Sequence, residues 1–171
     1  VFASGKNRVN PTARLHTNFR LDRTGEYLGL WDGAMQVLTE FAPAFPPQQA
    51  DYSAGPGTNG GVVYFREPSP GAKNGDSFSG FLEDIELNVK RGFFTSPVTV
   101  VITNIPAGAS VYYSLNGSTP TESSSHYTGP LTVSKTTTLR ARAIKPGFMS
   151  SRVHTGTYLF LSDVLQQTAA S

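Results

Sequence analysis

Hydrophobic and polar residues alternate along much of the chain with the two-residue period of a β-strand. In the first half, 35–41 alternates in part, 27–31 is a strand-like run, and 62–65 is a short apolar segment typical of a strand. Asp32-Gly33 lies between the first two segments and is typical of a hairpin turn. The segment 51–61 is rich in glycine and is expected to be a loop. The first half is therefore predicted to contain one hairpin and one further short strand.

The second half has a more regular pattern. Its strand-like segments are 85–89, 98–102, 110–115, 131–133, 138–144 and 153–160. Leu139, Ala141 and Ala143 fall on one face of their strand and arginines on the other, so the apolar face is expected to be buried. Asn116-Gly117 predicts a type I′ turn with both residues at positive φ. Strands repeated at this spacing indicate a β-sandwich. Residues 161–167 are the one place where a helical turn is expected.

The small polar residues 72–80 indicate a domain boundary. The predicted organisation is a first module at 1–75, a linker at 76–85, a second module at 86–160 and a C-terminal linker at 161–171. The chain begins without Met, on apolar residues that look like the end of a strand. It is therefore interpreted as a piece of a longer polypeptide, and the missing targeting signal carries no information.

Composition narrows the function classes. Charged residues make up 15% of the chain, the net charge is +2 and no run of Lys or Arg occurs, so nucleic acid is not an expected partner. No apolar run approaches the ~20 residues of a membrane helix, so membrane insertion is not expected. The chain has no Cys, which excludes disulfides, thiolate zinc sites and Cys nucleophiles.

Residues 1–75 resemble the C-terminal part of a bacterial lamin-tail domain, which is an immunoglobulin-like sandwich. The resemblance lies in the order of VFASGK at 1–6, LHTNF at 15–19, GEYL at 25–28, WDG at 31–33, FPPQ at 45–48, YF at 64–65 and PSPGA at 68–72. The opening strands expected of that domain have no counterpart here. The resemblance therefore implies an incomplete first sandwich.

Residues 86–160 resemble the chitobiase/β-hexosaminidase C-terminal domain, a fibronectin-III-like sandwich. The matching motifs are GASVYYSLNGSTPT at 108–121, YTGP at 127–130, KTTTLRARA at 135–143 and KPG at 145–147. The two resemblances together imply an all-β chain of two immunoglobulin-like or fibronectin-III-like modules. In that family the sandwich is an accessory domain and has no catalytic residues to carry over.

The residues themselves offer little chemistry. His16, His126 and His154 have no second histidine or acid at metal-ligand spacing, and each is interpreted as a polar surface residue. The acidic cluster around Asp84 (Glu83, Asp84 and Glu86) sits at the entrance of a strand and is interpreted as a solvated edge rather than a calcium site. No Gly-x-Ser-x-Gly motif is present. We therefore expect no catalytic residue, no metal and no cofactor.

Aromatic residues are the remaining candidates for binding. Flat aromatic rings can stack on sugars while neighbouring polar groups hold the hydroxyls. Tyr112 and Tyr113 are adjacent on a strand, so one is expected in the core and the other outside. The candidates for a glycan or interface contact are Trp31, Tyr52, Tyr113 and Tyr127, with Tyr112 and Phe148 also considered. Core or interdomain packing is the favoured interpretation for the set, and for Trp31 in particular.

Two functional hypotheses follow. In the first, the chain is a non-catalytic structural and adhesive module pair of a large secreted or cell-surface bacterial protein. Its partners are then other domains of the same polypeptide, or a second copy joined by strand addition. In the second, it is a carbohydrate-binding accessory of a polysaccharide-degrading enzyme, with polysaccharide as the partner. The second rests on analogy between folds.

Overall fold

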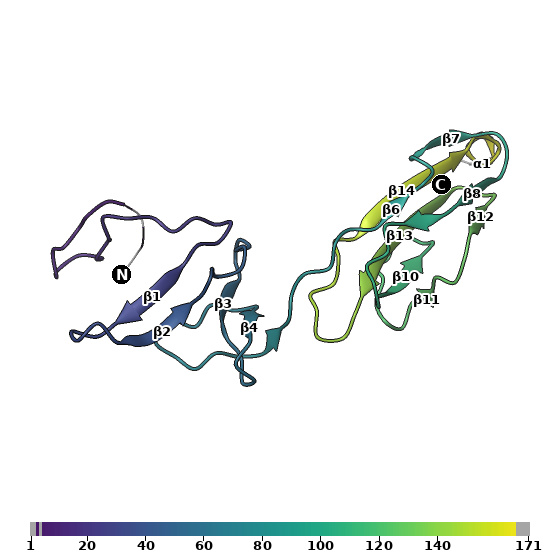
Figure 1. The fold of residues 1–171 in the computed structure, drawn as a ribbon. Helices are drawn as coiled ribbons and strands as arrows, with labels where there is room; N and C mark the ends of the chain where they lie inside the picture. Colours follow the sequence, from purple (N-terminus) through teal and green to yellow (C-terminus); the bar gives the residue numbers. More distant parts are fainter. Residues whose placement is uncertain (1–2, 4, 167–171) are drawn as a thin grey trace. The chain divides into compact units, whose positions relative to one another are not determined.

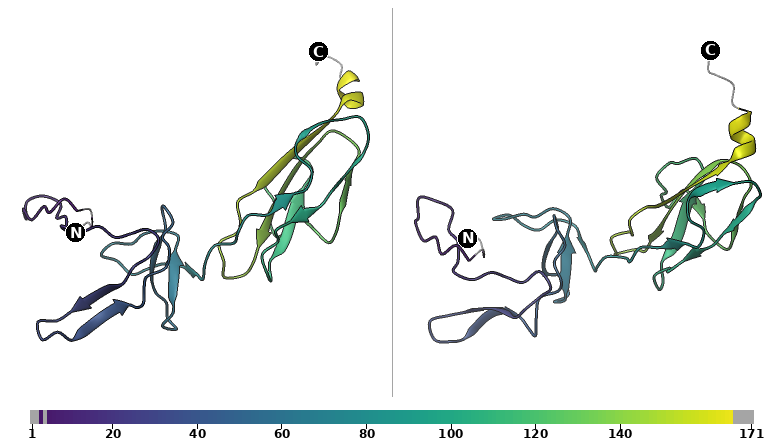
Figure 2. Two further views of the ribbon diagram at one scale, coloured as in Figure 1. Left: turned by 45° about the horizontal axis from the view of Figure 1, so that its top comes forward. Right: turned by 90° about the horizontal axis from the view of Figure 1, so that it is seen from above.

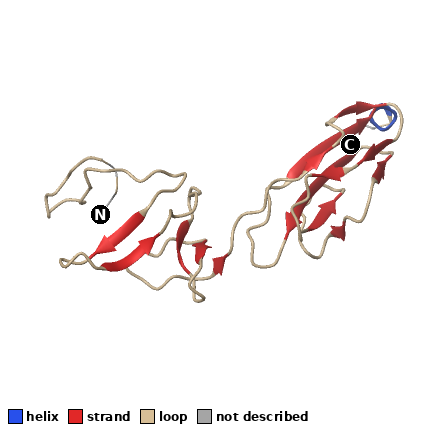
Figure 3. Ribbon diagram, viewed as in Figure 1, coloured by secondary structure: helices blue, strands red, loops and turns tan. Residues whose placement is uncertain are grey.

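The computed structural model describes residue 3 and residues 5–166, and these fold almost entirely as strands and turns (Figures 1 and 3). The chain divides into two compact units, one ending at Phe78 and one starting at Ser79. The only helix in the described part is α1 (Leu161–Leu165), which continues directly from the last strand (Figure 2). The predicted all-β class and the single helical turn are confirmed. The strand end expected at Val1 and Phe2 lies outside the described residues.

The first unit contains two small sheets. Strands β1 (Leu28–Trp31) and β2 (Val37–Phe41) form the predicted antiparallel hairpin. A second sheet has the order β3-β4-β5, from β3 (Ser53–Pro56), β4 (Val62–Phe65) and β5 (Ser77–Phe78).

Two of these strands correct the sequence-based expectation. Strand β3 lies in the segment expected as a glycine-rich loop, and β5 lies in the expected linker. Neither strand has an alternating apolar pattern that would have marked it in the sequence. Both are instead held by backbone pairing, one on each side of β4.

The turn between β1 and β2 is wider than a two-residue hairpin. The carboxylate of Asp32 accepts hydrogen bonds from the backbone N–H groups of Ala34 and Gln36, at 2.9 and 2.8 Å. Met35 follows with a φ of 59°, in the left-handed region, and the register shifts between Leu30 and Trp31. The turn thus uses Met35, rather than Gly33, as its left-handed residue.

Replacing Met35 with glycine is expected to stabilise the hairpin by about 0.5–1 kcal/mol, because left-handed backbone strains any residue with a Cβ atom. Little packing is lost, since Met35 is 74% exposed. The measurement is urea unfolding followed by the fluorescence of Trp31, the only tryptophan. Ala34→Gly is the control and should destabilise slightly, because Ala34 has no positive φ. A lower midpoint for Met35→Gly than for the parent chain would contradict the expectation.

The second unit is a β-sandwich, drawn in teal to yellow in Figure 1. Its main sheet has the order β11-β10-β13-β14-β7, and the pairs β12-β8 and β6-β9 supply the remaining strands. The strands are β6 (Glu86–Leu87), β7 (Gly92–Phe94), β8 (Val98–Val100), β9 (Ile102–Thr103), β10 (Ser110–Ser114), β11 (Ser125–His126), β12 (Leu131–Val133), β13 (Thr137–Ile144) and β14 (His154–Phe160). All pairs are antiparallel except β14 with β7.

The core of the second unit forms two adjoining clusters. One gathers around Ala141 (Ile85, Ile102, Val111, Ala141 and Ala143), and the other around Tyr158 (Val100, Val133, Leu139, Tyr158 and Phe160). Leu139, Ala141 and Ala143 are fully buried along β13, whereas the intervening arginines are partly exposed. The predicted facing of this strand is therefore confirmed.

The predicted type I′ turn at Asn116-Gly117 is wrong. Only Gly117 has a positive φ, 78°, and its N–H donates to the carbonyl of Thr138 at 3.1 Å. The side-chain oxygen of Asn116 accepts from the N–H of Ser118 at 3.0 Å. Strand β10 instead pairs with β11 across a long loop and with β13, and Asn116 extends the contact with β13 through a β-bridge to Thr138.

The segment expected as a linker, 76–85, is ordered by pairing at both ends. Beyond β5, the N–H of Leu82 donates to the carbonyl of Met149 at 3.0 Å, and Phe81 forms a β-bridge with Met149. Ile85 is completely buried in the core of the second unit. The second unit therefore begins several residues earlier than the sequence predicted.

Candidate functional site

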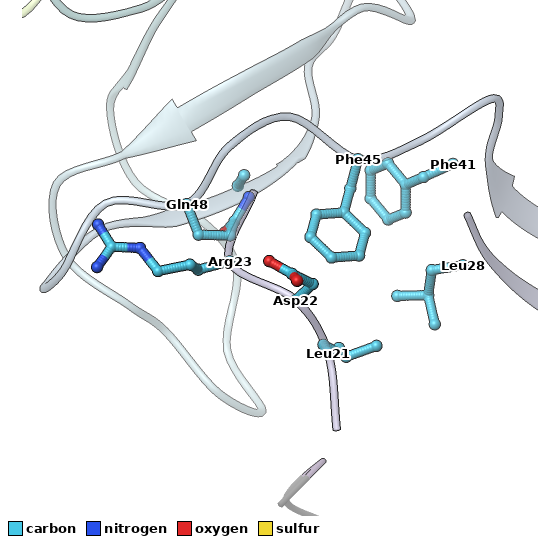
Figure 4. Close-up of a pocket in the computed structure, with 8 residues that line it drawn as sticks. Leu21, Asp22, Arg23, Leu28, Phe41, Phe45 and Gln48 are labelled. Carbon is cyan, nitrogen blue, oxygen red and sulfur yellow. The ribbon is translucent and has the colours of Figure 1, made fainter. Parts of the chain in front are cut away.

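A pocket of about 290 Å³ opens in the first unit. Its apolar wall consists of Leu21, Leu28, Phe41 and Phe45, while the guanidinium of Arg23 points away from it (Figure 4). The rings of Phe41 and Phe45 meet edge to face, with centroids 6.5 Å apart. Asp22, Gln48 and Ala54 complete the lining. An apolar side chain or ring is the group that such a pocket accommodates.

The pocket forms where the turn before β1 crosses the segment 45–48. The N–H of Phe45 donates to the carbonyl of Glu26 at 3.0 Å, and that of Gln48 donates to the carbonyl of Arg23 at 2.7 Å. Gly25 lies at the crossing with a φ of 103°. A Cβ atom there would lie 2.2 Å from the carbonyl oxygen of Phe45, so only glycine permits this approach.

The polar edge of the pocket is held by Asp22. Its carboxylate accepts hydrogen bonds from the backbone N–H and the hydroxyl of Thr24, at 2.8 and 2.7 Å. These hydrogen bonds, the backbone one first, hold the pKa of Asp22 below its ordinary value. The carboxylate is thus charged at neutral pH and exposed beside the apolar wall, a position suited to orienting a ligand and not to abstracting protons.

The other face of the hairpin carries an aromatic group. Tyr27, Gly29 and Trp31 alternate along the chain, and Glu40 is the cross-strand partner of Gly29. The hydroxyl of Tyr27 donates to the carboxylate of Glu40 at 2.9 Å. Burial of the hydroxyl, followed by the hydrogen bond to Glu40 and the charge of Glu40, raises the pKa of Tyr27. Tyr27 and Trp31 are 46% and 45% exposed, so their rings remain accessible.

The other aromatic candidates take part in packing. Tyr113 contacts both core clusters, and Tyr127 packs against the first of them while its hydroxyl accepts from the N–H of Ile102 at 3.1 Å. Tyr52 meets Phe78 edge to face at 5.7 Å inside the first unit.

Two further aromatic residues that the sequence analysis considered lie nearer the surface. Tyr112 is the outward member of its pair and lies beside His126, with ring centroids 5.4 Å apart. Phe148 lies under the ammonium of Lys145, which is 4.6 Å from the ring centroid. The structure thus brings none of the four principal candidates together, and Trp31 alone among them is exposed.

The histidines are separated. His16 belongs to the first unit, where burial and then the charges of Arg8 and Lys6 lower its pKa. His126 contacts Tyr112, and Nδ1 of His154 lies 3.1 Å from the carbonyl oxygen of Ile85. Among the described residues, no three side chains of His, Cys, Asp or Glu gather as metal ligands.

The acidic cluster contains an ion pair. The carboxylate of Asp84 accepts from the backbone N–H of Arg152 at 2.9 Å and from its Nε at 2.6 Å. The Nη2 atom of Arg152 also contacts this carboxylate. The side-chain hydrogen bond from Arg152 is the main reason that the pKa of Asp84 lies below its ordinary value. The pair ties the start of β6 to the start of β14.

Asp84→Asn is expected to lower the melting temperature at pH 7, with a cost of up to ~1 kcal/mol, because the pair is partly exposed. The depressed pKa means that the contribution of Asp84 is present above the unfolded-state value of 3.8 and is lost as the pH falls through the folded-state value. The difference between the two proteins should therefore shrink as the pH falls below 3.8. The measurement is thermal unfolding from pH 2 to 7, with Glu83→Gln as the control. A difference that is independent of pH would rule out the carboxylate as its source.

The second unit is thus an immunoglobulin-like sandwich, and the comparisons with known proteins define it further. Residues 89–155 match the family described as the Chitobiase/beta-hexosaminidase C-terminal domain. This confirms the resemblance of the second half to that family. No curated protein and no solved structure matches the chain. The likeness of residues 1–75 to a lamin-tail domain stays a prediction.

In the part of the chain that the structure describes, no helix has the length and apolar character needed to cross a bilayer.

Most residues of this site could not be picked out from the sequence pattern. Tyr27 was not a candidate, although the spacing Tyr27-x-Gly29-x-Trp31 places it on the same face of a strand as Trp31. Glu40 joins them only through the register of the hairpin. Leu21 and Phe45 come from segments without periodicity, so no local signal marked them as pocket residues.

Proposed function

We propose that this chain is a non-catalytic structural and adhesive region of a secreted or cell-surface bacterial protein that resembles glycoside hydrolases. The match of the second unit to an accessory domain family supports this function. In the proposal, the first unit is a partial lamin-tail-like sandwich that packs against a neighbouring domain of the same polypeptide.

The observation that carries the proposal is the apolar surface of the first unit. The pocket is apolar, and the same hairpin exposes Leu30 and Leu38 and leaves Val37 nearly half exposed. Apolar groups gathered in this way are stabilised by a covering partner. A domain of the same polypeptide is the favoured partner, because a covalent link gives even a small interface a high effective concentration.

The proposed lack of catalysis is supported by the contacts of Asp84, His126 and His154 in the second unit. Asp84 is held by Arg152, His154 lies against a backbone carbonyl, and His126 lies against a tyrosine ring. We expect no turnover of a panel of glycosides, esters and peptides. Reproducible hydrolysis that is lost in His126→Ala or His154→Ala would show that the protein is an enzyme.

The docking part is tested by hydrogen exchange. The amides of residues 21–48 should exchange more slowly in the longer polypeptide that the proposal implies than in this chain alone. As an independent check, the dye ANS should bind this chain. Its binding should be weaker to the pocket variant Phe41→Ser and unchanged to the control variant Leu115→Ser in the second unit. Equal exchange in both polypeptides would contradict the proposal. Concentration-dependent dimerisation that protects the same amides would make a second copy the partner and would also contradict it.

A further inference from the structure

The face of the hairpin opposite the pocket presents two aromatic rings and a carboxylate around a glycine. An ideal Cβ atom on Gly29 would lie 2.4 Å from the hydroxyl of Tyr27 and 2.8 Å from the indole nitrogen of Trp31. Both side chains therefore lean over the bare backbone of Gly29, with their polar atoms turned toward each other. Any larger residue at this position would push the rings apart.

A hydrogen bond holds part of this arrangement before any ligand arrives. The hydroxyl of Tyr27 donates to the carboxylate of Glu40 at 2.9 Å. The tyrosine hydroxyl is thereby satisfied within the group. Tyr27 and Trp31 are nearly half exposed, so a ligand can reach their rings.

The carboxylate distinguishes between two kinds of partner. An apolar protein surface packed on these rings would bury Glu40, and burying a charged carboxylate without enough hydrogen bonds is costly. A ligand with many hydroxyl groups can stack its C–H groups on the rings and donate to the carboxylate oxygen that Tyr27 does not use. The combination favours a sugar over an apolar polypeptide.

We propose that Tyr27, Trp31 and Glu40 form a binding site for the pyranose rings of a neutral polysaccharide. Trp31 and Tyr27 stack on the sugar, and Glu40 accepts hydrogen bonds from its hydroxyls. The site goes beyond the proposed docking function, because it lies on the other face of the hairpin and needs no neighbouring domain.

The protein contains a reporter at the site, because Trp31 is its only tryptophan. Titration of the whole chain with chitohexaose, cellohexaose and xylohexaose should give a saturable change in fluorescence with at least one of them. The change in fluorescence should persist at ~0.5 M NaCl, because salt at this concentration screens interactions between exposed charges but does not weaken stacking. Loss of the signal at high salt would show that charge, and not stacking on the rings, is responsible for the signal and would overturn the proposal.

Variants then connect the binding to the group. By calorimetry, Trp31→Ala should weaken binding at least about tenfold, as loss of a central aromatic contact does. Glu40→Gln keeps an acceptor for Tyr27, preserves the fold and should weaken binding several-fold, because a charged acceptor becomes neutral. Phe93→Ala removes a ring that is 70% exposed in the second unit and is the matched control, with unchanged binding expected.

Absence of a saturable signal with all three oligosaccharides would refute the proposed site, as would full affinity in both Trp31→Ala and Glu40→Gln. Neither result bears on the docking function, since that is tested by comparing hydrogen exchange in two polypeptides without any sugar. Conversely, equal exchange in the longer polypeptide would leave the sugar titration unaffected.

Discussion

Replacing Tyr158 with alanine is expected to lower the free energy of unfolding of the second unit by about 3–5 kcal/mol. Tyr158 is completely buried and is the largest side chain of its core cluster. Its ring packs against Phe94, with centroids 5.7 Å apart, and its hydroxyl donates to the carbonyl of Val89 at 3.0 Å. The substitution therefore removes both the ring and the partner of a backbone carbonyl. Urea unfolding followed by far-ultraviolet circular dichroism measures the change.

Two milder variants separate the contributions. Tyr158→Phe keeps the ring and should cost only about 1 kcal/mol, the net value of one hydrogen bond. Gly156→Ala should fall between these limits, because a Cβ atom there would lie 2.8 Å from the Tyr158 hydroxyl and 3.0 Å from Leu87. If Tyr158→Ala cost no more than Tyr158→Phe, the ring would not be the element that fills this core.

The sequence predicts the second unit well where one strand carries its own burial signal. Along β13, small or branched apolar residues alternate with arginines, and the structure buries the former and leaves the latter partly exposed. Strand β12 has the bounds expected from its short apolar run. Such strands have one face toward the core, so the local pattern carries the information.

Other strands depend on partners distant in the sequence. Strand β7, Gly92–Phe94, has no alternation and pairs in parallel with β14, more than 60 residues later in the numbering. Strand β11 contains only Ser125 and His126 and exists because it completes the edge of β10. A local reading cannot identify such strands, since their conformation is set by the neighbour and not by propensity.

At the candidate site, too, the sequence marks some residues but does not reveal whether the fold buries or exposes them. The sequence marks Trp31 as an aromatic candidate and favours a packing role for it, whereas the structure leaves this residue nearly half exposed. The sequence also marks Tyr113 and Tyr127, which the structure packs against the core. Exposure of an aromatic residue depends on the layer that covers it, and periodicity alone does not reveal that layer.

The two units are expected to differ sharply in stability. In urea, the Trp31 signal of the first unit should change at low concentration and over a broad range. The circular dichroism of the second unit should change later, in one steep transition. The same contrast should appear when residues 1–78 and 79–171 are produced separately and examined by sedimentation and urea unfolding.

The reason is the distribution of the core. Among the described residues, the buried hydrophobic side chains of the first unit are Phe45 and Phe65, whereas the second unit has two joined clusters of them. Two buried rings can offset only a small part of the conformational entropy lost when some 70 residues become ordered. A monomeric, cooperatively folding 1–78 would show that the first unit is complete without a covering partner. We expect 79–171 to fold alone, because its core is closed within the second unit. Failure to fold would show instead that the sandwich needs the first unit.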